Sequence, residues 1–263
     1  MPEPTRRTVL VTGASRRIGR VLALDLARAG WQVGVHYRRS REDADGLVAE
    51  IAALGVRAAA LDADLADHAA VSTLVARCEA VLGAPTCLIN NASEFLLDSV
   101  ETLTPERWQT HLDINLKAPV FLARALAEKL PEGADGVIIN IIDQRVWNLT
   151  PEFFSYTVSK AGLWSATRML AQALAPRVRV NAIGPGPVLQ SVHQTTADFA
   201  AEARSTLLGR ATSPAEIAAA VRFILDAPAM TGQMIALDAG QHLAWTHPSP
   251  ESEGGSPAGR PRS

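Results

Sequence analysis

The sequence predicts a doubly wound α/β fold of the Rossmann type, in which a parallel, seven-stranded sheet carries helices on both faces. Short runs rich in β-branched residues alternate with longer helical patterns, and strands that alternate with crossover helices form parallel sheets. The run Val137–Ile142 is almost wholly apolar, as expected of a central strand buried on both faces. A glycine-containing turn follows the first strand, and such folds bind their ligands at this edge of the sheet.

The expected elements follow one another in regular order. Strands are expected over residues 8–12, 31–37, 56–62, 86–90, 136–142, 178–183 and 234–237. Helices are expected over residues 17–29, 41–54, 69–82, 105–129, 155–174 and 214–225. The helix from residue 105 has a start signal in Thr104-Pro105-Glu106, because proline is favoured in a first helical turn. The connection after residue 184 is long, and we expect a mobile lid over residues 187–208.

Length and composition bound the partners and the location. A chain of 263 residues that is 48% hydrophobic fits one domain, expected over residues 1–245, with a disordered tail over 246–263. The net charge of −2 gives no reason to expect nucleic acid or an anionic membrane as a partner. No apolar run reaches the roughly 18–20 residues of a membrane span, and the N-terminus lacks the layout of a signal peptide. We therefore expect a soluble, cytoplasmic protein.

The cysteines and histidines do not predict a metal site. The two cysteines, Cys78 and Cys87, have no metal-type spacing and are expected to be small buried residues in a reducing compartment. None of the six histidines has a ligand spacing with cysteines or acids.

The turn Thr12–Gly19 is the strongest local signal. Gly13 permits a tight turn, and Gly19 lets the first helix approach the sheet. The free N–H groups at the start of that helix then face the position of a pyrophosphate. Because a strand precedes the turn and a helix follows it, the pattern predicts a dinucleotide site.

The end of the second strand indicates which dinucleotide binds. An enzyme that uses NAD usually has an acid here, to hold the ribose 2′-hydroxyl. This chain has Arg38, Arg39 and Ser40 instead, and guanidinium groups match a 2′-phosphate in charge and geometry. NADPH is the expected cofactor, and the alternative is a solvated basic turn. Asp64 and Leu65 close the third strand where an adenine ring could lie, although Asp64 or Asp67 could equally cap the next helix.

Tyr156 and Lys160 form a candidate reaction centre. Their i, i+4 spacing places both side chains on one face of a helix. A nearby ammonium lowers the pKa of a phenol, so the pair can serve as the general acid of a reduction. Taken alone, the pair could be an ordinary surface contact. Other polar residues fall at the same sheet edge, however: Asn90, Asn91, Ala92 and Ser93 after the fourth strand, Asn115 in the following helix, and Asn181, Pro185 and Gly186 after the sixth.

Together these motifs resemble the short-chain dehydrogenase/reductase family over about residues 8–240. The resemblance implies that Tyr156 donates a proton, that Lys160 lowers its pKa and holds the nicotinamide ribose, and that Asn115 orders a relay water. It also implies a homo-oligomer, either a dimer or a tetramer. The implied cofactor contacts are Gly13, Ser15, Arg17, Ile18, Gly19, His36, Tyr37, Arg38, Arg39, Ser40, Asp64, Leu65, Asn91, Ala92, Ser93, Tyr156, Lys160, Pro185 and Gly186.

Two departures from the family pattern concern the substrate. Arg17 stands where the family usually has a glycine, and Asp143 stands thirteen positions before Tyr156, where it usually has a serine. A carboxylate beside a developing alkoxide is unfavourable in a pocket of low dielectric. Asp143 therefore favours a substrate with N–H donors or a C=N bond, to which its carboxyl can bind or deliver a proton.

Both departures, and the stretch Asn91–Phe95, resemble pteridine reductases and bacterial dihydromonapterin reductases, which use NADPH. The resemblance implies that Phe95 stacks a pterin and that Arg17, Ser93, Phe95, Asp143 and Tyr156 contact substrate; the alternative for Phe95 is a core aromatic. The expected reaction is hydride transfer from NADPH to a pterin C=N carbon, with a proton from Tyr156 or from a water held by Asp143. The alternatives are a ketone or 3-oxoacyl reductase, and a non-catalytic NADPH-binding regulator.

Overall fold

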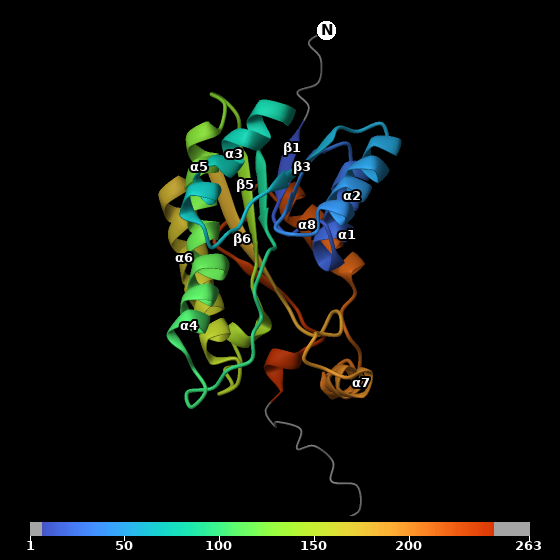
Figure 1. The fold of residues 1–263 in the computed structure, drawn as a ribbon, viewed down its shortest axis with the longest axis vertical. Helices are drawn as coiled ribbons and strands as arrows, with labels where there is room; N and C mark the ends of the chain where they lie inside the picture. The colour runs from blue at the N-terminus through green and yellow to red at the C-terminus, as the bar shows by residue number, and fades with distance from the viewer. Residues whose placement is uncertain (1–6, 245–263) are drawn as a thin grey trace, which may run out of the picture.

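A computed structural model describes residues 7–244 and contains the predicted sheet (Figure 1). All seven strands are parallel, in the order β3-β2-β1-β4-β5-β6-β7. Their bounds are β1 (Thr8–Val11), β2 (Gln32–Tyr37), β3 (Ala58–Asp62), β4 (Cys87–Asn90), β5 (Gly136–Ile141), β6 (Val178–Pro185) and β7 (Met234–Leu237). The fold class is therefore confirmed, and each predicted strand is present within a few residues at its ends.

Helices cover both faces of the sheet because the strands are apolar on both sides. Leu10 of β1 packs toward α3 and α5, whereas its neighbours Val9 and Val11 pack toward α1, α2 and α8. Figure 1 shows these two layers on opposite sides of the sheet. The bounds are α1 (Arg17–Arg28), α2 (Arg41–Ala53), α3 (His68–Leu82), α4 (Pro105–Leu112), α5 (Ala118–Lys129), α6 (Phe154–Leu174), α7 (Thr196–Ser205) and α8 (Pro214–Asp226).

The single helix expected over residues 105–129 is interrupted. Helices α4 and α5 are joined by a π-helical turn, Asp113–Lys117. Pro119 has no N–H to donate to the carbonyl of Asn115 four residues earlier, and its ring crowds that carbonyl. The wider turn relieves this crowding and contains Asn115, in keeping with the frequent occurrence of π-turns at functional sites.

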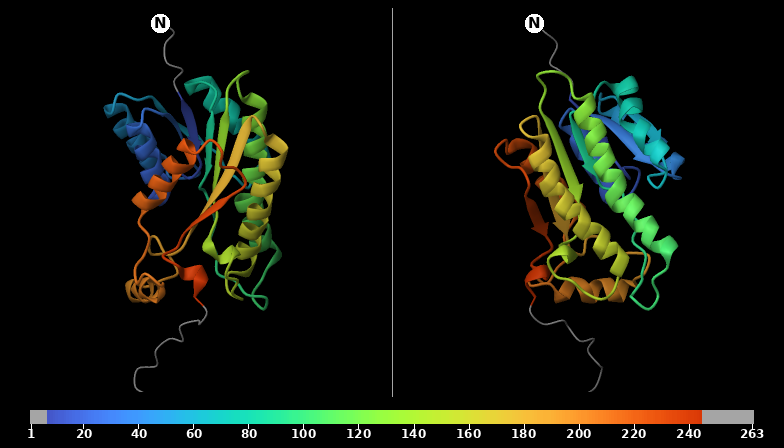
Figure 2. Two further views of the ribbon diagram at one scale, coloured as in Figure 1. Left: turned by 180° about the vertical axis from the view of Figure 1, so that it is seen from behind. Right: turned by 90° about the vertical axis from the view of Figure 1, so that its left-hand side faces the viewer.

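The connection between β6 and α8 contains a helix that the sequence analysis did not predict. Thr195 and Asp198 form a capping box at the start of α7. In Figure 2, α7 lies across the end of the molecule to which the carboxyl ends of the strands point. The expected lid is thus a structured segment placed over the edge of the sheet where ligands bind in this fold.

Two further expectations concern the chain as a whole. Among residues 7–244, no helix is both long and apolar enough to cross a bilayer. The tail predicted to be disordered, residues 246–263, lies outside the described residues.

Candidate active site

The turn after β1 is shaped by close backbone approaches. Gly13 has φ +62°, and a Cβ there would lie 3.0 Å from the Cα of Ala92. A Cβ on Gly19 would lie 2.2 Å from the carbonyl oxygen of Gly13, so both positions require glycine. Arg17 adopts φ +53°, which costs a side-chain-bearing residue roughly 1–2 kcal/mol. The arginine therefore occupies a backbone conformation suited to the glycine that the family usually has there.

His36 and Asn91 hold this turn in place. His36 Nδ1 accepts a hydrogen bond from Gly13 N at 2.9 Å, and its Nε2 lies 3.1 Å from the carbonyl oxygen of Ala63. Burial lowers the pKa of His36 to about 4, so the ring is neutral and Nε2 carries the proton. Asn91 Nδ2 donates to the carbonyls of Thr12 and Gly13 at 2.9 and 3.2 Å. Both residues belong to the predicted cofactor set, and the structure shows them shaping the turn.

Arg38 and Arg39 are exposed after β2, as a phosphate-binding role requires. Arg38 forms an ion pair with Glu94, 2.7 Å between Nη1 and Oε1. Strand β1 lies between β2 and β4 in the sheet. The ion pair therefore bridges the segments after β2 and β4 across the carboxyl end of β1. Nothing in the sequence analysis predicted the contact with Glu94.

The remaining predicted nucleotide residues lie around the same edge. Ser15 and Ser40 are joined through their hydroxyls at 2.8 Å. Asp67 caps α3 by accepting from Ala69 N, whereas Asp64 accepts from Ala66 N within its own loop. A Cβ on Gly186, directly after β6, would lie 2.7 Å from Asp238 Cα.

Asn115 is completely buried and ties the loop after β4 to the interior. Its Oδ1 accepts from Ser93 Oγ and Glu94 N at 3.1 and 2.9 Å. Its Nδ2 donates to the Glu94 carbonyl at 3.0 Å and to Ser159 Oγ at 3.1 Å. These bonds occupy both ends of the side-chain amide, and the expected role of Asn115 in ordering a water stays a prediction.

The structure brings Asp143 and Tyr156 together. Asp143 follows β5, and its Oδ1 accepts from Arg145 N at 2.8 Å. The Tyr156 hydroxyl donates to the other carboxyl oxygen, Oδ2, at 2.8 Å. Burial raises the pKa of Asp143, so this carboxyl holds a proton more readily than an ordinary aspartic acid.

Lys160 lies beside the ring of Tyr156. Lys160 Nζ donates to the carbonyl of Ile141 at 2.9 Å and lies 5.7 Å from the centre of the Tyr156 ring. The pKa of Tyr156 lies well above 10 because the phenol is buried and faces the carboxyl of Asp143. Burial lowers the pKa of Lys160 to about 8. Burial and the carboxyl of Asp143 therefore set the direction of the Tyr156 pKa shift in this structure, and the expected role of Lys160 stays a prediction.

Aromatic side chains border this pair. Phe95 stacks on Phe153, with ring centres 4.2 Å apart and planes at 7°, and meets the Tyr156 ring edge-on at 4.7 Å. Phe95 is only partly buried, so it is not a deep core aromatic. Phe153 was not predicted, because it lies before α6 with no pattern of its own.

The lid contacts both ends of the candidate site. Arg17 donates to the carbonyls of Leu189 and Gln190 at 3.1 and 3.0 Å. His193 Nε2 lies 2.9 Å from the carbonyl oxygen of Phe95. Arg17 thus links the glycine turn to the lid, and its expected contact with substrate or phosphate stays a prediction.

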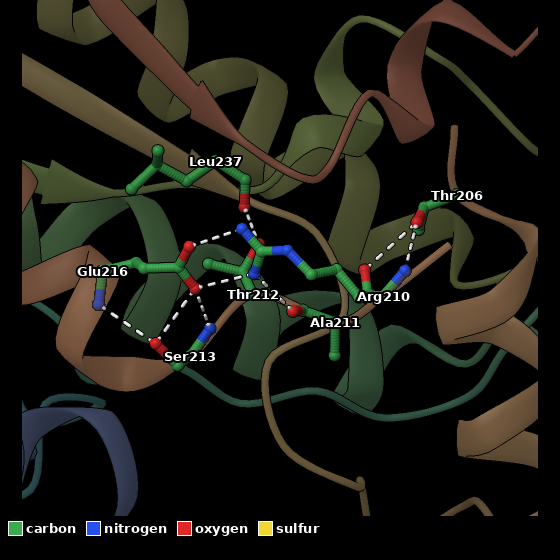
Figure 3. Close-up of polar contacts among 7 residues, drawn as sticks. All are labelled: Thr206, Arg210, Ala211, Thr212, Ser213, Glu216 and Leu237. Carbon is green, nitrogen blue, oxygen red and sulfur yellow. Dashed lines mark hydrogen bonds and ion pairs between the residues drawn. The ribbon is translucent and has the colours of Figure 1, made fainter. Parts of the chain in front are cut away.

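The end of the lid is fixed by the cluster in Figure 3. Arg210 binds both carboxyl oxygens of Glu216, at 3.0 and 2.7 Å. The hydrogen bond from Arg210 is the main reason that the pKa of Glu216 falls to about 2. Thr212 donates to the carbonyl of Leu237 through its hydroxyl and to that of Pro187 through its N–H, both at 2.8 Å. These bonds connect the first residue of the lid, Pro187, to the segment that follows the lid, and that segment to β7.

The candidate residues form two groups at the same edge of the sheet. A glycine turn and a basic edge lie on one side, and a carboxyl–phenol pair with an aromatic ring lies on the other. Among residues 7–244, no group of three or more histidine, cysteine or acidic side chains is arranged to hold a metal.

Comparison with known proteins assigns the chain to a family. Residues 13–242 match the family model described as enoyl-(acyl carrier protein) reductase. The chain belongs to the short-chain dehydrogenase/reductase family. It is an oxidoreductase of that family, as the sequence analysis predicted.

Two kinds of family member are similar to this chain. The structure of FolM alternative dihydrofolate reductase 1 from Brucella canis, complexed with NADP, has 46% sequence identity and a TM-score of 0.87, covering 92% of this chain and 96% of that chain. The Brucella suis protein, also in complex with NADP, has 47% identity and a TM-score of 0.89. The 3-oxoacyl-[acyl-carrier-protein] reductase FabG of Staphylococcus aureus is 31% identical over 242 residues, 90% of this chain and 98% of that protein.

Proposed function

We propose that this protein is an NADPH-dependent reductase of the C=N bond of a pterin-like substrate. One observation carries the proposal. A carboxyl oxygen of Asp143, at the position where the family usually has a serine, lies 2.8 Å from the Tyr156 hydroxyl. An acid at this position suits a heterocycle with ring nitrogens and an amino group, because it can accept N–H hydrogen bonds or deliver a proton. The similarity to two NADP-bound alternative dihydrofolate reductases supports the same conclusion.

The residues at the glycine turn fit a phosphorylated dinucleotide. Gly13 and Gly19 permit the close backbone approaches that form the turn. Helix α1, which lies entirely in the described part of the chain, has no side-chain cap, so its first N–H groups are available to a pyrophosphate. Arg38 and Arg39 would hold the 2′-phosphate through charge-assisted hydrogen bonds.

The chemistry divides between the cofactor and the protein. NADPH, when bound, supplies a hydride to the carbon of the C=N bond and leaves as NADP⁺. Tyr156 or Asp143 delivers the proton to the nitrogen, so that one hydride and one proton complete the reduction. The raised pKa of both groups keeps a proton at this pair near neutral pH. Lys160 holds the cofactor ribose, and Phe95 stacks against the flat ring of the substrate.

A direct assay tests the proposal. Purified protein is mixed with NADPH and dihydrobiopterin, dihydromonapterin or dihydrofolate, and NADPH absorbance is followed; 3-oxoacyl thioesters and simple ketones serve as comparison substrates. We expect turnover with at least one pterin. If the protein reduces ketones but no pterin, the substrate assignment is contradicted and the reductase assignment is left intact.

The second candidate is a 3-oxoacyl reductase, favoured by the similarity to FabG proteins. Asp143 counts against it, because a carboxylate opposes the negative charge that develops on a carbonyl oxygen. We also propose a homo-oligomer, on the family resemblance, and size-exclusion chromatography with light scattering tests it.

A further inference from the structure

Three buried polar side chains from separate elements form a chain of hydrogen bonds beside the reaction centre. Asp98 lies in the loop after β4, His111 in α4 and Ser155 in the first turn of α6. Each is at most 1% exposed. Burying polar groups is costly unless every one is hydrogen-bonded, so this arrangement calls for a reason.

The hydrogen bond from Leu96 N to His111 determines the direction of the other hydrogen bonds in the network. His111 Nε2 accepts from Leu96 N at 3.1 Å, so the neutral ring carries its proton on Nδ1. Nδ1 lies 2.6 Å from Ser155 Oγ and donates to it. The Ser155 hydroxyl in turn donates to Asp98 Oδ2.

This set of residue types also occurs in nucleophilic triads, but the geometry here differs. In a triad, the histidine accepts the proton of the serine and the acid holds the histidine. Here the Ser155 hydroxyl points to Asp98, and the accepting nitrogen of His111 is already bonded to Leu96 N. Ser155 is fully buried, so it is no nucleophile. Burial lowers the pKa of His111, and the positive charges of Arg107 and Lys160 lower it further. The negative charges of Asp98 and Glu94 act in the opposite direction but are weaker than burial.

The network connects the loop that carries Phe95 to the helix that carries Tyr156. Asp98 Oδ1 accepts from Ser155 N at 3.2 Å, and its carbonyl accepts from Phe154 N at 3.3 Å. Asp98 thus caps the start of α6 from another loop, since residue 153 provides no side-chain cap. At the other end, His111 binds the residue that follows Phe95.

We propose that Asp98, His111 and Ser155 are positioning residues that fix the Phe95 ring against Tyr156, and so set how a flat substrate lies relative to the proton donor. The two ring centres are 4.7 Å apart, and the network spans the loop and helix that carry them. The proposal rests on the proposed function, because only a planar heterocycle uses both rings.

The test compares two variants of the same helix. Ser155→Ala removes the hydroxyl that joins Asp98 to His111. Thr167→Ala is the matched control, because Thr167 is also fully buried in α6 and hydrogen-bonded, to Asn140 and the Leu163 carbonyl. For Ser155→Ala we expect kcat/KM for the pterin to fall about tenfold, since misplacement by a fraction of an ångström costs rate steeply. NADPH binding, measured by fluorescence, should match that of wild type.

Thermal unfolding and a conservative variant separate positioning from simple destabilisation. If both variants lower Tm alike and only Ser155→Ala loses pterin turnover, the positioning role is supported. Equal losses in both variants, or wild-type kinetics in Ser155→Ala, would overturn it. We also expect Asp98→Asn to keep part of the activity that Asp98→Ala loses, because an amide oxygen can still accept from Ser155.

A measurement on the unmodified protein covers the case in which the variants do not fold. ¹⁵N NMR should show His111 as the neutral Nδ1–H tautomer, and an Nε2–H tautomer would contradict the network. Absence of pterin turnover in wild type would reject the proposed function and this inference together. Turnover in wild type with no selective effect of Ser155→Ala would reject the positioning role alone.

Discussion

The two walls of the candidate site are built in different ways. One wall is formed by β5, α6, the loop after β4 and the π-helical turn that contains Asn115. There the Tyr156 hydroxyl donates to Asp143 and the buried Asn115 donates to Ser159. On the lid, Val192 is 91% exposed, and α7, every residue of which is described, has no buried residue. The lid reaches the site through two backbone carbonyls that accept from Arg17 and through the side chain of His193.

This contrast suggests that the buried wall serves the chemical step and that the lid controls access to the site. Proton transfer requires donors held in a fixed geometry, which buried hydrogen-bonded side chains provide. A segment with few buried contacts opens at low cost in free energy, as entry and release of substrate require. Changes in the buried wall should therefore alter the rate of the chemical step, whereas changes in the lid should alter binding and protection.

The largest effect is expected at the buried wall. Tyr156→Phe removes the hydroxyl that binds Asp143 but keeps the ring that packs against Phe95. We expect kcat to fall by about 100-fold or more, the usual contribution of a general acid. Fluorescence titration with NADPH should give a wild-type Kd, and wild-type turnover by this variant would assign proton delivery to another group.

The cofactor edge should show the next largest effect. In Arg38→Ala and Arg39→Ala, loss of a charge-assisted hydrogen bond to the 2′-phosphate should raise the KM for NADPH by about tenfold or more. The KM for NADH should change little, because NADH has no 2′-phosphate. Arg124→Ala is the control, since Arg124 is exposed on α5 and pairs with Glu128 at 2.7 Å. Equal losses with both cofactors would contradict the phosphate role.

The pH profile provides a smaller, graded test of the same wall. The pKa of Lys160 is lowered to about 8 by burial, so the free protein loses the ammonium as the pH rises through that value. The kcat/KM for NADPH, which reports on free enzyme, should fall on the alkaline side of about pH 8. Lys160→Arg should move this fall to higher pH, because a guanidinium stays charged. A flat profile up to pH 10 would mean that the charge of Lys160 does not matter.

The smallest effect is expected at the lid. Glu216→Gln weakens the pairing with Arg210 shown in Figure 3. The pKa of Glu216 is lowered from 4.5 to about 2, so its stabilising contribution is present above pH 4.5 and is lost as the pH falls toward 2. Limited proteolysis at neutral pH should cut the variant faster between residues 187 and 212, with kcat nearly unchanged. Identical cleavage in Glu216→Gln and wild type would show that this pair does not hold the lid.

The parts of the site that could be predicted from sequence are those with local patterns. The i, i+4 spacing of Tyr156 and Lys160 and the glycine turn can both be recognised in the sequence itself. Asp143 was found because its distance from Tyr156 along the chain is fixed by the strand, the turn and the start of α6. The order of strands and helices followed from hydrophobic periodicity in the same way.

The parts that could not be predicted depend on contacts distant in sequence. Glu94 meets Arg38 because the sheet order places β2 and β4 on either side of the same strand, β1. His193 reaches Phe95 across 98 residues. The π-helical turn had a local signal in Pro119, but hydrophobic periodicity across residues 105–129 masked it. The raised pKa of Tyr156 depends on burial, which no spacing reveals.

The central claim is that the carboxyl of Asp143 selects a nitrogen heterocycle over a ketone. The most direct test is the ratio of kcat/KM for a dihydropterin to that for a ketone substrate, measured in wild type and in Asp143→Ser. We predict that the variant, which restores the serine usual in the family, loses pterin reduction and keeps or gains ketone reduction, so that the ratio falls at least tenfold. An unchanged ratio would contradict the claim.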